Sequence, residues 1–334
     1  MSLTSLLDHP SFLRDFFCRH FGNTKEIVKD INDEISKLPL IGNSNLLPAD
    51  AGTIGTAFDY RARFYFQNYD PHATVAFEGA KLLLDHNYRT TLLHRSLIYE
   101  LFSRLYRDVL TIQPSGKKLR AIQEERLNIY CLVLTFFEQQ FRMRDMSIIV
   151  DREESILESF LASKTVEGFM GKVRSHQDKL LHDLRALSDV FYRDWGAYLQ
   201  ERRFILNPTF SGSRDVGGAD ADFIMGRILF ELKTNRTPRP INRVMLWQLI
   251  GYPLLDFRNE YKLSKVGFYF ARRGYRIEWT LANLLSILSG RQLSLISWRK
   301  QLSKVIGHSE RVKLQKDALF GLARMGLERK FGVL

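Results

Sequence analysis

Two carboxylates and one ammonium in a short stretch, Asp222, Glu231 and Lys233, are the residues best suited to chemistry. Glu231 lies within the apolar run Ile228–Leu232, and Lys233 directly follows it. The two residues are two positions apart, so on a strand they project from one face. Buried charges are costly unless they are paired or hold a metal. Two carboxylates and the backbone carbonyl of Leu232 suit Mg²⁺ or Mn²⁺, which favours phosphodiester hydrolysis. Lys233 would orient or help deprotonate the attacking water, or stabilise developing negative charge.

A predicted hairpin would bring these groups together. Phe223–Met225 and Ile228–Leu232 are short apolar runs, and Gly226 and Arg227 between them predict a tight turn. The turn returns the second strand beside the first and brings Asp222 to Glu231. Asp220 is the rival carboxylate. It falls in the preceding Gly-Gly-Ala loop, whereas Asp222 directly precedes the apolar run and is therefore preferred.

The elements after this hairpin predict a small sheet. A polar break with two prolines is followed by a predicted helix over 242–257. Residues 266–271 and 275–280 then read as two strands, with Arg272, Arg273 and Gly274 as the turn between them. The order strand, strand, helix, strand, strand predicts an α/β or α+β core, a small mixed sheet flanked by helices.

The hairpin sequence, residues 217–235, resembles the D-(x)n-ExK motif of PD-(D/E)XK nucleases. It is most similar to the branch that contains the RecB, Cas4 and lambda-exonuclease-like enzymes. That branch often carries Q-x-x-x-Y on the next helix, where this chain has Gln248 and Tyr252 on one helix face. The resemblance implies a restriction-endonuclease-like core and a Mg²⁺- or Mn²⁺-dependent nuclease. It also implies that Gln248 lies near the active centre and that Tyr252 supports DNA contact or local structure.

A second part of the resemblance lies near the N-terminus. RecB-type members often carry a G-T-x-x-H helix whose histidine binds metal, and residues 55–59 read Gly-Thr-Ala-Phe-Asp. Asp59 therefore stands at the histidine position. The resemblance implies that Asp59 is a further metal ligand, and the alternative is an ordinary surface aspartate in an early helical turn.

The resemblance covers roughly residues 52–67 and 215–280 and suggests four regions. They are N-terminal helices over 1–73 that include the first core helix at 52–67, a helical insertion over 74–203, a nuclease core over 204–290 and a basic helical segment over 291–334. Apolar residues recur at spacings of three and four through the insertion, including one run over 173–203. The resemblance explains neither the insertion nor the basic segment.

The charge balance predicts a polyanionic partner. The chain carries a net charge of +12, and nucleic acid is the first candidate, with DNA preferred and RNA left open. Arg272, Arg273 and Arg276 alternate with aromatic residues on the second predicted hairpin. They would hold a phosphate backbone beside stacked bases, or they form a solvated turn beside core aromatics.

Other sequence features limit the cellular environment and the kinds of site that are expected. Two separated cysteines make a zinc site or a disulfide framework improbable, and no apolar run reaches the roughly 20 residues that span a bilayer. The first residues do not read as a secretory signal, so a cytoplasmic protein without membrane contact is expected. The resemblance implies a role in restriction, phage defence or recombination and repair, alone, as a homo-oligomer or with protein partner subunits.

Two other functions remain open at this stage. One is a PD-(D/E)XK-like core that has lost its chemistry and binds nucleic acid or protein within a larger complex. The other is a helical scaffold in which the Glu-x-Lys spacing is incidental. The secondary structure at Glu231 and Lys233 separates them, because a helix there would favour the scaffold.

Overall fold

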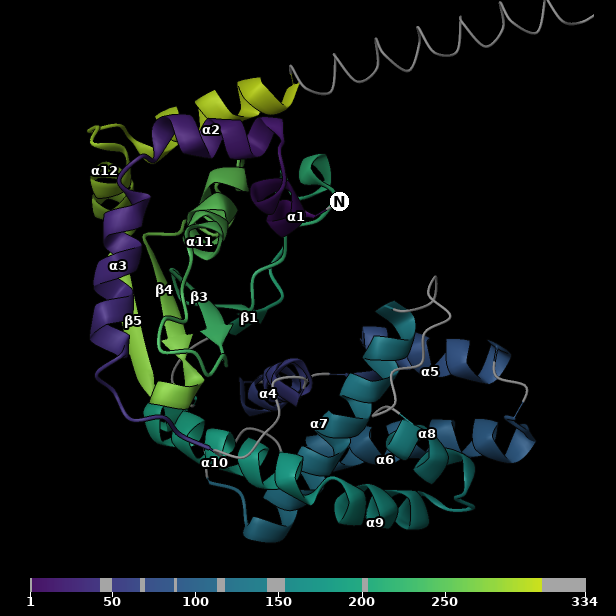
Figure 1. Ribbon diagram of the computed structural model, residues 1–334. Helices are drawn as coiled ribbons and strands as arrows, with labels where there is room; N and C mark the ends of the chain where they lie inside the picture. The colour runs from purple at the N-terminus through teal and green to yellow at the C-terminus, as the bar shows by residue number, and fades with distance from the viewer. Residues whose placement is uncertain are drawn as a thin grey trace, which may run out of the picture.

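The computed structural model describes residues 2–42, 50–66, 70–86, 89–112, 118–142, 154–199 and 204–307. Helices dominate it, and one sheet lies among them (Figure 1). The helices are α1 (Leu3–Asp8), α2 (Phe12–His20), α3 (Thr24–Ile35), α4 (Asp50–Phe66), α5 (Val75–His86), α6 (Leu92–Ile112), α7 (Ala121–Arg142), α8 (Glu154–Leu161), α9 (Val166–His176), α10 (Asp178–Trp195), α11 (Arg243–Leu255) and α12 (Leu281–Ser289). The strands are β1 (Phe204–Leu206), β2 (Phe223–Met225), β3 (Ile228–Lys233), β4 (Lys265–Phe270) and β5 (Tyr275–Thr280).

The sheet is mixed and its strands lie in chain order, β1 to β5. β1, β2 and β3 pair antiparallel, β3 and β4 pair parallel across the α11 connection, and β4 and β5 form an antiparallel hairpin. Gly226 has a φ of 63°, a conformation that costs other residues energy, so it fits the tight β2–β3 turn. Both predicted hairpins and the helix between them are confirmed, as is the mixed α/β class.

The two faces of the sheet belong to two different cores. Phe223, Met225, Phe230 and Tyr269 join a core built largely from α4 to α10. The alternate residues of the strands join a second core with α1, α2, α3, α11 and α12. Figure 1 shows the sheet between these layers, with α5 to α9 extending away from the strands. Alternation along each strand therefore decides which helices each side chain meets.

The helices between α4 and β1 are packed onto the rest of the protein. α4 contacts both α7 and α10, and the core of these helices continues onto the sheet. The apolar run over 173–203 contains two helices, and residues 200–203 lie outside the described residues. Its backbone leaves helical geometry at Gln177, so α9 ends at His176 and α10 begins at Asp178. The turn lets α10 pack back on α4 while α9 packs on α7.

The basic C-terminal segment is helical over 295–307, and residues 308–334 lie outside the described residues. Arg299 in this helix is buried. It donates to the Pro253 carbonyl at 2.8 Å and pairs with Asp256 at 3.4 Å, so this arginine anchors the helix to the end of α11. None of the described helices is long and apolar enough to cross a membrane.

Candidate functional site

The β2–β3 hairpin brings the predicted carboxylates together. Phe223 pairs with Phe230, and the same register continued by one residue sets Asp222 opposite Glu231. The Leu232 amide donates to Asp222 Oδ2 at 2.5 Å. Glu231 and Lys233 both lie on strand β3, and Lys233 Nζ donates to Glu231 Oε2 at 2.9 Å. The strand placement that disfavours the scaffold interpretation is therefore confirmed.

Burial makes this group electrostatically unusual. Glu231 is 3% exposed, and its Oε1 has no hydrogen-bond partner among the described residues. Burial raises the pKa of Asp222 to about 7, and the charge of Glu231 adds to the rise. Burial works against the charge of Lys233, but Glu231 and Asp222 outweigh it and raise the pKa of the ammonium. Lys233 is thus held as a cation, which suits charge stabilisation better than proton abstraction.

Helix α11 places Gln248 and Tyr252 beside these groups. Both lie one turn apart on the same helix, and Gln248 Nε2 donates to Tyr252 Oη at 2.6 Å. Tyr252 is buried, and its ring stacks on Phe210 with 5.5 Å between centroids. Burial raises the pKa of Tyr252, followed by the charges of Glu231 and Asp222. Tyr252 is therefore packed in the core on the side of the sheet where Glu231 and Asp222 lie.

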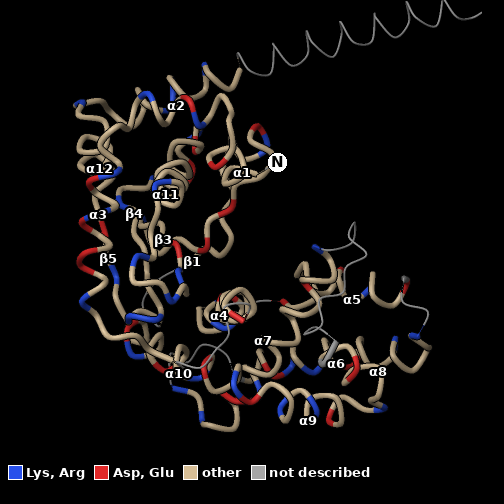
Figure 2. The backbone as a smooth tube through the Cα atoms, in the orientation of Figure 1, with Lys and Arg blue, Asp and Glu red and all other residues tan. Residues whose placement is uncertain are grey.

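A cavity of about 390 Å³ opens between this end of the sheet and helices α4 and α7. Asp59 of α4 lines it together with Asp220, Asp222 and Leu232. Acidic positions mark the chain beside β1 and β3 and on α4 in Figure 2. Helix α4 comes close to the sheet end at Gly55, where an added Cβ would lie 3.0 Å from Thr234 Oγ1 and that side chain would have to shift. The helix with the Gly-Thr match thus reaches the predicted site.

Asp220 and Asp222 occupy different environments in this cavity. Asp220 is exposed and makes an isolated bridge with Thr209, whereas Asp222 directly precedes β2 and contacts the Leu232 amide. Only Asp222 lies opposite Glu231 in the hairpin register. The geometry therefore favours Asp222 over its rival as the partner of Glu231.

A divalent cation of this kind needs several oxygen ligands in one place. Within the described residues, no group of three or more His, Cys, Asp or Glu is arranged to hold a metal, so Asp59 does not form a three-carboxylate cluster with Asp222 and Glu231. Asp59 is ion-paired with Arg63, and burial raises its pKa to about 6. The buried oxygen of Glu231 that lacks a partner fits a cation held by two carboxylates and a carbonyl.

Of the three arginines predicted on the second hairpin to contact nucleic acid, Arg272 needs correction. Arg272 is 1% exposed, and its guanidinium binds Asp183 with two bonds of 3.0 and 2.6 Å, so it is structural and does not reach a phosphate backbone. Arg273 donates to the Leu38 carbonyl at 2.7 Å. Arg276 pairs with Glu278 at 3.1 Å and lies over the Trp195 ring. All three arginines have partners within the fold, which favours the alternative of a turn beside core aromatics.

Three charged residues of the cavity were not predicted from the sequence. Arg63 of α4 and both Glu138 and Arg142 of α7 line it beside Asp59 and Asp222. Asp59 with Arg63 and Glu138 with Arg142 are each four apart, a spacing that predicts ion pairs on one helix. Nothing in that spacing indicates that the two helices meet at one cavity.

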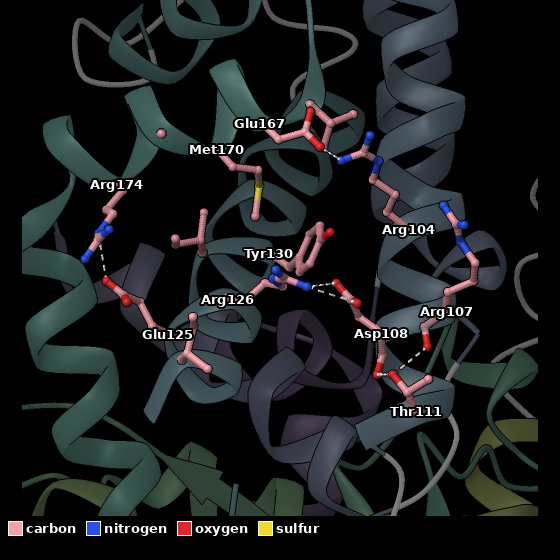
Figure 3. A pocket seen from close by; sticks show the side chains of 14 residues that line it. Arg104, Arg107, Asp108, Thr111, Glu125, Arg126, Tyr130, Glu167, Met170 and Arg174 are labelled. Atoms are coloured by element: carbon pink, nitrogen blue, oxygen red, sulfur yellow. Dashed lines mark hydrogen bonds and ion pairs between the residues drawn. The ribbon is translucent and has the colours of Figure 1, made fainter. Parts of the chain in front are cut away.

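A larger cavity, of about 650 Å³, lies between α6, α7 and α9 (Figure 3). None of the predicted site residues lines it. Its floor includes Ile129 and Met170. Three arginines at its rim are paired with acids: Arg104 with Glu167, Arg126 with Asp108 at 3.4 Å and Arg174 with Glu125 at 2.8 Å. The smaller cavity carries the better case for chemistry, because Asp222 lines it and lies opposite Glu231, whose buried Oε1 has no hydrogen-bond partner among the described residues.

The raised pKa of Asp222 predicts a pH-dependent stability. Between its ordinary value of 3.8 and about 7, the folded protein retains a proton that the unfolded chain releases, so rising pH favours unfolding. In EDTA, wild type should lose about 1–3 kcal/mol more unfolding free energy over this interval than Asp222→Asn. Urea unfolding at pH 4.5, 6 and 7.5 measures the difference. Identical pH profiles for the two proteins would contradict the raised pKa.

Comparison of the chain with protein-family models, with curated proteins and with solved structures finds no match in any of the three. A functional assignment therefore has to come from the residues and geometry of the site.

Proposed function

We propose that this protein is a Mg²⁺- or Mn²⁺-dependent nuclease that hydrolyses phosphodiester bonds in DNA, with a PD-(D/E)XK-like core. The observation that carries the proposal is the buried Glu231–Lys233 pair on β3, with Asp222 opposite it and one Glu231 oxygen left without a partner. Burying charges of this kind costs free energy of folding, and such charges are typically found at functional sites. The antiparallel β1–β2–β3 unit, followed by α11 and a parallel β4, fits such a core.

Each residue has a distinct role in this proposal. Asp222, Glu231 and the Leu232 carbonyl would hold the divalent cation, which when bound supplies charge stabilisation at the reacting phosphate. Lys233, kept protonated by its acidic neighbours, orients the attacking water and offsets negative charge as it develops. Gln248 and Tyr252 fix the wall behind Glu231. Asp59 faces the same cavity from α4 and holds Arg63 there.

Cleavage of labelled DNA tests the proposal. Linear and circular substrates, single- and double-stranded, are incubated with the protein in Mg²⁺, Mn²⁺ or EDTA. We expect cutting that requires the metal, and cleavage of circular DNA would identify an endonuclease. Binding without cutting in every metal would overturn the enzymatic proposal and favour an inactive core that binds nucleic acid.

A further inference from the structure

Two ion pairs on neighbouring helices face the proposed site. Asp59 and Arg63 are paired on α4, and Glu138 and Arg142 are paired on α7. The helices pack against each other, and Tyr60 Oη of α4 donates to Glu138 Oε2 at 2.6 Å. This bond fixes Glu138, and Arg142 Nε donates to its other oxygen at 2.8 Å. Arg63 lies over the Tyr60 ring, 5.6 Å from its centroid, so Tyr60 contacts both Arg63 and the residue that holds Arg142.

Both arginines line the cavity that contains Asp222. Among the described residues that line it, Arg63 and Arg142 are the cations, while Lys233 is turned to Glu231 on the α11 side of the sheet. A nucleic-acid strand brings one negative charge per nucleotide, and binding depends on neutralising those charges with Lys or Arg. The cavity wall opposite Asp222 is thus the surface on which a substrate phosphate would find cations.

The two arginine side chains differ in solvent exposure. The Arg142 side chain is 70% exposed, so its guanidinium can exchange Glu138 for a phosphate oxygen at little cost in desolvation. The Arg63 side chain is only 15% exposed and lies close to Asp59. Gly52 on the same wall carries no side chain, and nothing lies within 4 Å of where its Cβ would be, which leaves room for a polymer backbone to approach. The less exposed Arg63 and the more exposed Arg142 therefore suit contacts with two points along one nucleic-acid strand.

We propose that α4 and α7 form the phosphate-binding wall of the nuclease site, with Arg63 and Arg142 contacting the DNA backbone next to the bond that is cut. This inference rests on the proposed function and gives the helical segment between α4 and β1 a direct part in it. Glu138 acts as a positioning residue, since it reaches the substrate only through Arg142.

The test is the salt dependence of DNA binding by Arg142→Gln. Binding of a labelled single-stranded oligonucleotide is measured by fluorescence anisotropy in EDTA, so that no strand is cut, over a series of salt concentrations. We expect affinity to fall about 3- to 10-fold and the slope of log K against log salt to become shallower by about 0.7. Loss of a merely structural arginine would leave that slope unchanged.

Arg174→Gln is the matched control. Its side chain is 64% exposed and paired with Glu125 at 2.8 Å, but it lines the other cavity. It removes the same charge and should keep the wild-type slope. If the wild-type protein cuts DNA but Arg142→Gln has the same salt dependence as Arg174→Gln, the proposed phosphate-binding wall is wrong and the proposed nuclease function is retained. If wild type neither binds nor cuts DNA, both proposals are overturned. Arg142→Lys should retain most of the slope.

Discussion

Glu231→Gln and Lys233→Ala should each lower metal-dependent DNA cleavage by about 100- to 1,000-fold, the loss typical when one preorganised electrostatic group is removed. Glu231→Gln keeps the shape of the side chain but removes the charge that would bind the cation. Lys233→Ala removes the ammonium that lies 2.9 Å from Glu231. Initial rates on linear DNA at saturating Mg²⁺ measure both effects.

Stability measurements separate chemistry from folding in these variants. Glu231→Gln leaves the buried Lys233 ammonium without its anionic partner, so the melting temperature in EDTA should fall, and cleavage is compared well below that temperature. Lys265→Ala is a matched control, because Lys265 lies on the adjacent strand and its ammonium is 3.5 Å from Glu278. The Lys265→Ala variant should cut DNA at the wild-type rate. Cleavage that survives both Glu231→Gln and Lys233→Ala would mean that hydrolysis occurs elsewhere.

The parts of the site that were predictable are local in sequence. Asp222, Glu231 and Lys233 occupy one hairpin of twelve positions, and the turn at Gly226 with strand alternation determines which side chains meet. Gln248 and Tyr252 share a helix face by spacing alone. Local geometry fixes these relations before any tertiary contact forms, so a single sequence suffices to predict them.

The parts that were missed depend on contacts distant in sequence. Glu138 reaches the cavity because α7 packs on α4, and no pattern in either helix specifies that pairing. The break at Gln177 leaves the apolar period intact and is set by how α9 and α10 pack. A buried and an exposed arginine read the same in sequence, which is why Arg272 was interpreted as a nucleic-acid contact. Its partner Asp183 is 89 residues away.

The buried Arg272–Asp183 pair is expected to contribute strongly to stability. Arg272→Ala should lower the free energy of unfolding by about 3–5 kcal/mol, because it leaves the fully buried Asp183 without its bidentate partner. The guanidinium also donates to the Thr234 carbonyl at 2.6 Å and the Ile41 carbonyl at 3.3 Å. Urea unfolding monitored by circular dichroism measures the loss.

Arg273→Ala in the same turn is the matched control, since losing its hydrogen bond to the Leu38 carbonyl, the one it makes among the described residues, should cost only about 1 kcal/mol. Asp183→Ala should resemble Arg272→Ala, and the double variant should lose less than the sum, because both changes remove one pair. Thr234 directly follows Lys233, so Arg272 also holds the end of β3 that carries the ammonium. Arg272→Ala should therefore slow cleavage even below its melting temperature. If Arg272→Ala loses no more unfolding free energy than Arg273→Ala, the structural role of Arg272 is wrong and the originally expected nucleic-acid contact is favoured.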